Sequence, residues 1–146
     1  MAASNVSVAS LLIEDDVRIR KLLKQVRTIA VVGASTKPWR DSYQIAQFLI
    51  DRGYKVFPVN PSYEDVLGLK CYPDLLSVPE RIDLVDIFRR PEAVGEIVQQ
   101  AIAVNAGAIW MQLGVSNEEA AKLAADAGIQ VVMDRCIALD YRRLMH

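Results

Sequence analysis

Histidine and cysteine are scarce in this 146-residue sequence. The single histidine, His146, is the last residue, which argues against histidine-dependent catalysis and against histidine-rich metal sites. The two cysteines, Cys71 and Cys136, are too few for a disulfide framework, and nothing in the sequence indicates an oxidising compartment. We therefore expect a cytoplasmic protein with no metal site and no acid–base catalytic constellation, and thus not an enzyme.

Long apolar runs and a large net charge are also missing. No apolar stretch approaches the roughly 20 residues that cross a bilayer, and the first ten residues lack the pattern of a secretory signal. The formal net charge is −1, so no basic field favours binding to nucleic acid or to an anionic membrane. The remaining composition, 52% hydrophobic and 24% charged, is typical of one globular domain with a full-sized core.

Five apolar strand patterns alternate with helical patterns along the chain. The predicted strands cover residues 28–33, 55–60, 83–88, 108–113 and 129–133, and a short final helix is predicted over 137–144. Strands separated by helices indicate a parallel sheet with right-handed crossovers. We predict a single doubly wound, Rossmann-like α/β domain with helices on both faces of a five-stranded parallel sheet, in the order 3-2-1-4-5. The domain is expected to span 15–146, including an N-terminal amphipathic helix, after a loose N-terminus over 1–14.

Residues 28–38, TIAVVGASTKP, predict the ligand-binding loop. The buried strand ends at Gly33, a residue that permits a turn where the backbone passes close to another group. The next helix is expected to begin near Asp41, with Gln44 three residues later at capping-box spacing. A strand, a short loop and a helix start together direct backbone N–H groups and the helix dipole at an anion. We therefore predict phosphate binding by the loop and by nearby cations, namely Gly33, Ala34, Ser35, Thr36, Lys37 and Arg40.

The other strand ends supply the remaining candidate residues. In an open parallel sheet, ligands bind beyond the carboxyl ends of the strands, which places the site at the switch between strands one and four. The candidates there are Asn60, Pro61, Phe88, Arg89, Arg90, Gln112, Gly114 and Cys136. Arg89 and Arg90 oppose the dipole of the helix that they precede, which favours an anionic partner. The set contains cations, amides and one thiol, and it suits a phosphorylated ligand better than acid–base catalysis.

The nucleotide-binding motifs of other families fit this loop poorly. A dinucleotide fingerprint needs three glycines and an acidic residue about 20 residues later, whereas Ser35 and Pro38 occupy the second and third glycine positions. The second strand ends in Asn60 instead of an acid, and the P-loop pattern is absent. An NAD(P)-binding oxidoreductase-like domain, or a non-catalytic regulatory or scaffold subunit, remains the alternative.

Longer segments carry a family resemblance. The segments AVVGASTKPWRDSYQIAQFLIDRGYKVFPVNP, GLKCYPDLLSVP, VDIFRRPEAV, IWMQLG and VVMDRC resemble the small stand-alone CoA-binding domain family. That family is similar to the CoA-binding domain of the succinyl-CoA synthetase α subunit. The match runs from about residue 26 to residue 144, nearly the whole chain, with the motifs in family order.

The resemblance implies a coenzyme A or acyl-CoA ligand and a place for each part of it. The loop over 33–37 would take the CoA phosphates, Asn60 and Pro61 would border the adenosine, and residues 88–90 would flank the cleft. Gln112 and Gly114 would lie near the pantetheine path. The ATP-grasp partner domain and the phosphoryl-carrying histidine of the ligases are absent from this sequence, so it does not predict their reaction for this chain alone. A homodimer or an acyl-CoA enzyme remains a possible partner.

Cys136 suggests thiol chemistry with the same ligand. It follows Arg135 at the carboxyl end of a strand, a position where an adjacent cation favours the thiolate form of a cysteine. CoA also ends in a thiol, and a mixed disulfide between the two is chemically accessible. The alternative is a small buried structural residue.

Overall fold

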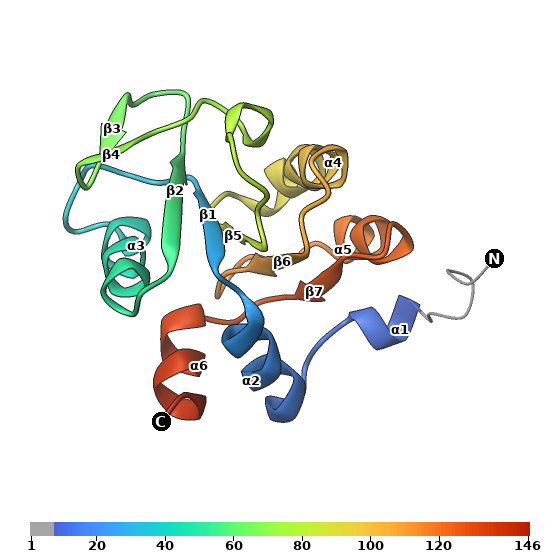
Figure 1. Cartoon of the computed structure of the whole chain (residues 1–146). Coiled ribbons are helices and arrows are strands. Elements are labelled where there is room, and N and C mark those ends of the chain that lie inside the picture. The colour runs from blue at the N-terminus through green and yellow to red at the C-terminus, as the bar shows by residue number, and fades with distance from the viewer. Residues whose placement is uncertain (1–7) are drawn as a thin grey trace.

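The computed structural model of the protein describes residues 8–146 and has a central five-stranded parallel sheet (Figure 1). The sheet strands, in spatial order, are β2 (Lys55–Val59), β1 (Thr28–Val32), β5 (Leu84–Ile87), β6 (Ala108–Met111) and β7 (Gln130–Val132). The short strands β3 (Asp65–Val66) and β4 (Leu69–Lys70) form a separate antiparallel pair after β2. The prediction of one α/β domain with a five-stranded parallel sheet is confirmed.

The strand order differs from the predicted one. Counted along the chain, the five sheet strands lie in the order 2-1-3-4-5, so the predicted order 3-2-1-4-5 is wrong. β5, the third strand, pairs with β1 from Ile29↔Leu84 to Val32↔Ile87. β2 is thereby left at the edge, a position that tolerates its Pro58. The carbonyl of Pro58 accepts a hydrogen bond from the Tyr72 N–H (3.0 Å) on the outer side of the strand, where the missing proline N–H also lies.

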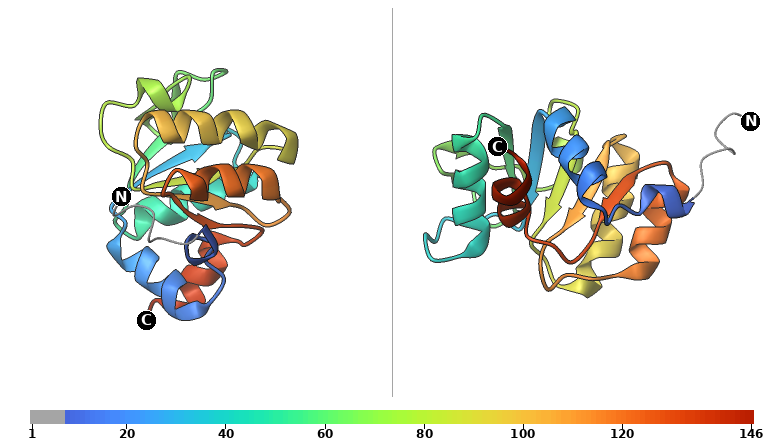
Figure 2. Two further views of the ribbon diagram at one scale, coloured as in Figure 1. Left: turned by 90° about the vertical axis from the view of Figure 1, so that its right-hand side faces the viewer. Right: turned by 90° about the horizontal axis from the view of Figure 1, so that it is seen from below.

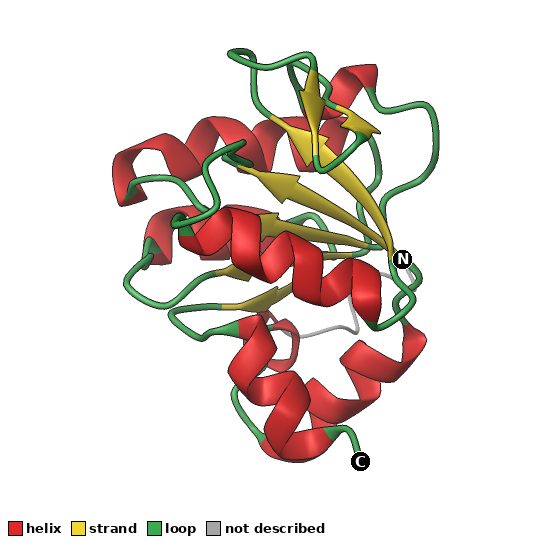
Figure 3. Ribbon diagram, turned by 90° about the vertical axis from the view of Figure 1, so that its left-hand side faces the viewer, coloured by secondary structure: helices red, strands yellow, loops and turns green. Residues whose placement is uncertain are grey.

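Two layers of helices cover the sheet (Figure 2). One face carries α2 (Asp16–Gln25), α3 (Asp41–Asp51) and α6 (Ile137–Leu144), and the other carries α4 (Val94–Ala103) and α5 (Glu118–Asp126). β1 shows how the sequence produces this, because its apolar residues alternate between the two cores. Ile29 and Val31 belong to the core under α2, α3 and α6, whereas Ala30 and Val32 belong to the core under α4 and α5. Figure 3 shows the sheet strands pointing to one common edge, where the loops gather.

The N-terminal segment packs against the far edge of the sheet. Of the residues expected to form a loose N-terminus, 1–7 lie outside the described residues. Residues 8–14 contain the short helix α1 (Val8–Leu11), and the Ile13 N–H donates to the Val131 carbonyl at 2.8 Å. Ile13 is buried, and Arg18 donates to the Leu12 carbonyl. The packed domain therefore begins before Asp15.

Two short 3-10 helices complete the connections. They are η2 (Leu75–Ser77), before β5, and η3 (Pro91–Ala93), which leads directly into α4. Pro91 occupies the first turn of η3, where its missing N–H has no helical partner to lose. Among residues 8–146, no helix combines the length and apolarity that a membrane crossing requires.

Candidate functional site

The turn at Gly33 lies between the carboxyl ends of β2 and β5. Its N–H donates to the Val59 carbonyl at 2.9 Å, and the Phe88 N–H donates to the Val32 carbonyl at 2.8 Å. Gly33 has φ +89°, and a Cβ atom there would lie 2.5 Å from the Phe88 carbonyl oxygen. Only glycine fits this conformation and this approach. The topological switch point is therefore between β1 and β5, which corrects the expected position between strands one and four.

The loop after Gly33 is held by side-chain hydrogen bonds. Buried Ser35 accepts a hydrogen bond from the Lys37 N–H at its Oγ (3.0 Å). Asn60, at the end of β2, donates from Nδ2 to the Ala34 carbonyl (2.8 Å) and accepts from the Ser62 N–H at Oδ1 (2.9 Å). These bonds tie the loop to the neighbouring strand end, so its backbone groups are fixed before any ligand arrives.

Several backbone N–H groups of the loop and of the α3 start remain open. Within residues 8–146, the N–H groups of Ser35, Thr36, Asp41 and Ser42 have no hydrogen-bond partner. The predicted capping box is wrong, since α3 has no side-chain cap and Gln44 donates instead to the Pro38 carbonyl (3.1 Å). The uncapped helix start leaves its dipole and its amides available to an anion.

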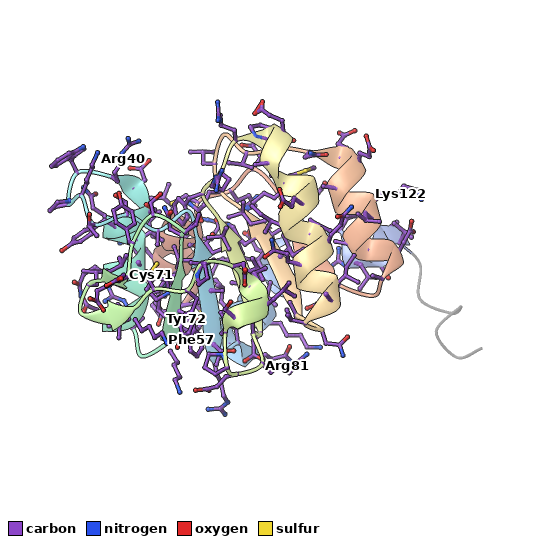
Figure 4. The ribbon with its side chains drawn as sticks, turned by 90° about the horizontal axis from the view of Figure 1, so that it is seen from above. Arg40, Phe57, Cys71, Tyr72, Arg81 and Lys122 are labelled. Carbon is purple, nitrogen blue, oxygen red and sulfur yellow. The ribbon has the colours of Figure 1, made fainter. Side chains whose placement is uncertain are left out.

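Ser35, Asp41 and Ser42 line a cavity of about 670 Å³, which we call the loop cavity. Its lining residues are Gly33, Ala34, Ser35, Lys37, Trp39, Arg40, Asp41, Ser42, Asn60, Tyr63 and Phe88. Seven predicted site residues thus meet there, while sequence reasoning did not assign Asp41, Ser42 or Tyr63 to the site. Asp41 contributes the one carboxylate of the lining, and Figure 4 shows Arg40 at the surface on the segment that leads into α3.

The predicted cations remain without carboxylate partners. Within the described part of the chain, Lys37, Arg40, Arg89 and Arg90 form no ion pair. Lys37 and Arg40 line the loop cavity, and the Arg89 side chain passes close to Gly33. Lys37 and Arg40 are therefore cations without an ion-pair partner in the same lining as Ser35, Asp41 and Ser42.

A second cavity of about 400 Å³, which we call the apolar cavity, adjoins the first. The two cavities share Asp41 and Phe88 in their linings. Gln112 and Cys136, two of the predicted site residues, both line the apolar cavity. Gln112 is buried and accepts a hydrogen bond from the Ile137 N–H at Oε1 (3.3 Å), while the partly exposed Cys136 is the N-terminal cap residue of α6.

The remaining predicted residues lie outside these two cavities. Pro61 and Arg89 line a separate cavity of about 150 Å³ beside η2 and α4. Thr36, Arg90 and Gly114 line neither the loop cavity nor the apolar cavity. The Gly114 N–H donates to the Asp134 carboxylate at 2.7 Å, which fixes the turn after β6.

Arg135, which was expected to favour the thiolate form of Cys136, forms an ion pair with Asp140. Its guanidinium donates two hydrogen bonds to the buried carboxylate of Asp140, at 2.7 and 3.0 Å. Arg143 donates to the same carboxylate at 3.1 Å and to Asp16 at 2.7 and 2.8 Å. The arginine therefore fastens the start of α6, and the thiol lies beside the positive end of that helix.

Asp86 is a buried acid beneath the site that the sequence reasoning missed. It is fully buried in β5, and within residues 8–146 neither carboxylate oxygen has a hydrogen-bond partner. Burial raises the pKa of this carboxyl well above its usual range. Its register neighbours are Val31 and Trp110, and Phe88 follows two residues later on the same face. An acid inside the apolar strand sequence DLVDIF was the available signal.

No metal site accompanies these features. Within the described residues, no group of three or more histidine, cysteine, aspartate or glutamate side chains is arranged to hold a metal ion.

Comparisons with known proteins identify relatives of two kinds. The chain is 36% identical over 119 residues to the Bacillus subtilis protein named "Uncharacterized protein YneT", covering 82% of this chain and 88% of that protein. It is also 34% identical over 98 residues to the Archaeoglobus fulgidus "Acetate--CoA ligase [ADP-forming] II". That match covers 63% of this chain and 14% of the ligase, so the chain corresponds to a small part of the larger enzyme.

Solved structures agree with the sequence matches. A hypothetical protein from Pyrococcus horikoshii OT3 superposes with a TM-score of 0.89 at 44% identity, covering 91% of this chain and 94% of that one. The "dinucleotide forming Acetyl-coenzyme A synthetase 1" of Ca. Korarchaeum cryptofilum superposes with a TM-score of 0.67 at 27% identity, over 77% of this chain and 28% of that one. The model of the CoA binding domain family matches residues 27–142. The chain therefore belongs to the CoA-binding domain family.

Proposed function

We propose that this protein binds coenzyme A, free or acylated, and does not itself catalyse a reaction. The observation that carries the proposal is the set of open N–H groups at Ser35, Thr36, Asp41 and Ser42 beside unpaired cations. Backbone donors at a helix start and nearby cations are the groups that bind phosphate in proteins. CoA carries a diphosphate and a ribose phosphate, and the loop over 33–37 would hold the diphosphate.

Two neighbouring cavities offer room for the separate parts of this ligand. Asn60, in the lining of the loop cavity, would border the adenosine, and the pantetheine arm would pass Phe88, which lines both cavities. Gln112 would lie along that arm. The volumes of about 670 and 400 Å³ are in the range of small-molecule sites.

The side chains of the site support binding without turnover. The linings of the two cavities contain one carboxylate, that of Asp41, and no histidine. Cavities without a positioned acid–base pair favour a carrier, a sensor or a regulatory subunit of an acyl-CoA enzyme. The proposal includes a cytosolic location, where free thiols such as Cys71 and Cys136 stay reduced.

Cys136 adds a covalent state to the proposal. Its thiolate would attack one sulfur of CoA disulfide, forming the Cys136–CoA disulfide and releasing one CoA thiolate, which takes up the proton that Cys136 lost. The position of Cys136 in the lining of the apolar cavity supports this step. Intact-protein mass spectrometry under non-reducing conditions should show one added CoA on the wild type and none on Cys136→Ser. Equal addition to both, or addition to neither, would contradict it.

Thermal unfolding with a ligand panel tests the binding proposal. A ligand that binds only the folded state raises the melting temperature by mass action. We expect CoA to raise it and NAD⁺ to leave it unchanged. Ser35→Pro removes one open N–H and should abolish the CoA effect, whereas Arg20→Ala, an exposed cation on α2, should preserve it. Stabilisation by NAD⁺ alone, or a full CoA effect in Ser35→Pro, would refute the assignment.

A further inference from the structure

Exposed apolar side chains gather around the two cavities. Large apolar residues are usually exposed singly, and a cluster marks a binding surface. Six such side chains are exposed within residues 8–146, and three of them, Trp39, Leu113 and Leu139, line the loop cavity or the apolar cavity. Leu113 is 66% exposed and Leu139 is 58% exposed, and both line the apolar cavity. This rim indicates that the ligand brings an apolar group there.

Helix α3 contributes two apolar side chains, Ile45 and Phe48, to the lining of the apolar cavity. Phe48 is buried and is held in place by its neighbours. The Phe48 ring meets the Tyr141 ring edge-on with centroids 5.5 Å apart, and the Arg142 guanidinium lies 4.7 Å from the Phe48 centroid. The complete lining is Asp41, Gln44, Ile45, Phe48, Phe88, Gln112, Leu113, Val115, Cys136, Ala138, Leu139 and Arg142. The apolar members of this lining offer surface to an aliphatic chain, and they are Ile45, Phe48, Phe88, Leu113, Val115, Ala138 and Leu139.

We infer that the apolar cavity binds the acyl chain of an acyl-CoA, so that the protein prefers aliphatic acyl thioesters to free CoA. This inference rests on the proposed function, because the phosphates must be held in the loop cavity for the sulfur end to reach this cavity. The two cavities share Phe88 and Asp41 in their linings, so they lie side by side on the same face of the domain. This adjacency to the proposed phosphate site favours an acyl chain over a second protein surface as the occupant.

Calorimetric titration with CoA, acetyl-CoA, butyryl-CoA and octanoyl-CoA tests the inference. The affinity should rise along the series by about two- to fourfold for each methylene that becomes buried. Leu113→Gln and Leu139→Gln place polar groups on the rim at exposed positions, so the fold should tolerate them. In each variant, the gain in affinity from CoA to octanoyl-CoA should be much smaller than in the wild type, measured against that variant's own affinity for CoA. Leu76→Gln, at an exposed leucine on η2 that lines neither cavity, should keep the full gain.

Each contrary result has a distinct meaning. Equal affinity for CoA and octanoyl-CoA would overturn the inference and leave the proposed function intact. A chain-length gain that survives both leucine substitutions would also overturn it. Failure of every compound to bind, CoA included, would contradict the proposed function and the inference together. A wild-type dimer that Leu139→Gln dissociates, as shown by light scattering, would assign the rim to contacts between copies of the chain.

Discussion

Replacing the buried acid Asp86 should stabilise the protein. A buried polar group with no hydrogen-bond partner lowers the free energy of unfolding by about 1–3 kcal/mol, and neither oxygen of Asp86 has a partner within residues 8–146. Asp86→Val removes the carboxyl and suits a strand position. We expect it to raise the melting temperature by about 2–4 °C for each kcal/mol gained in a domain of this size.

The gain from this substitution should depend on pH. Burial raises the folded-state pKa of Asp86 well above its ordinary value of 3.8. Above that ordinary value the unfolded chain releases the proton while the folded protein keeps it, so rising pH favours unfolding. The free energy of unfolding of the wild type should therefore fall, relative to Asp86→Val, by about 1.4 kcal/mol per pH unit from about pH 4 up to the folded-state pKa. Below the ordinary value both states are protonated, and the difference should become constant.

Urea unfolding of both proteins from pH 4 to pH 8 measures this slope. Asp86→Asn is the matched control, because it keeps a buried polar group of the same shape and removes the titration. It should match the wild type near pH 4 and exceed it near pH 8. Variants that are less stable than the wild type at every pH, with no change in the difference, would refute the account of an unpartnered, protonated acid.

Three further substitutions test the frame of the site. Gly33→Ala should lower the free energy of unfolding by about 1–3 kcal/mol more than Gly53→Ala does. Both glycines have positive φ, but only at Gly33 would the new Cβ atom press against backbone atoms. Equal losses of stability in urea unfolding of the two variants would contradict this. Asp140→Ala should lower the free energy of unfolding, measured in the same way, by about 2–4 kcal/mol, because it leaves Arg135 without its carboxylate partner. A loss below about 0.5 kcal/mol, which is typical of a neutral surface substitution, would refute this role of Asp140. Asn60→Ala should weaken CoA binding in calorimetry about tenfold by releasing the loop, and unchanged affinity would show that the loop needs no tie to β2.

Local patterns in the sequence predicted the elements well. The run from Thr28 to Val32 is mostly apolar because both faces of β1 are covered. Its end at Gly33 correctly predicted where the strand stops and the loop begins. The final helix was predicted over 137–144 and is observed as Ile137–Leu144. Such features depend on residues that are close together in the sequence, so they can be predicted from it.

Features that depend on distant pairing were beyond the sequence patterns. The order of the strands depends on which strands pair, and these are far apart in the sequence. Pro58, which has no N–H to donate, was the one local indication that its strand lies at an edge of the sheet. Gln44 had the spacing of a capping residue, yet a backbone carbonyl earlier in the loop takes its hydrogen bond. The sequence suggested that Arg135 acts on the adjacent Cys136, but in the folded chain its guanidinium donates a hydrogen bond to Asp140, five positions later on α6. In each case the competing partner is visible only once the chain is folded.

We propose that the open N–H groups in the loop after β1 and at the start of α3 bind the CoA phosphates. Amide chemical-shift mapping by NMR during titration with CoA tests it most directly. We expect the largest shifts at the backbone amides of Ser35, Thr36, Asp41 and Ser42, with smaller shifts at Gln112. Shifts confined to another surface, such as the exposed faces of α4 and α5, or no shifts at saturating CoA, would contradict this proposal.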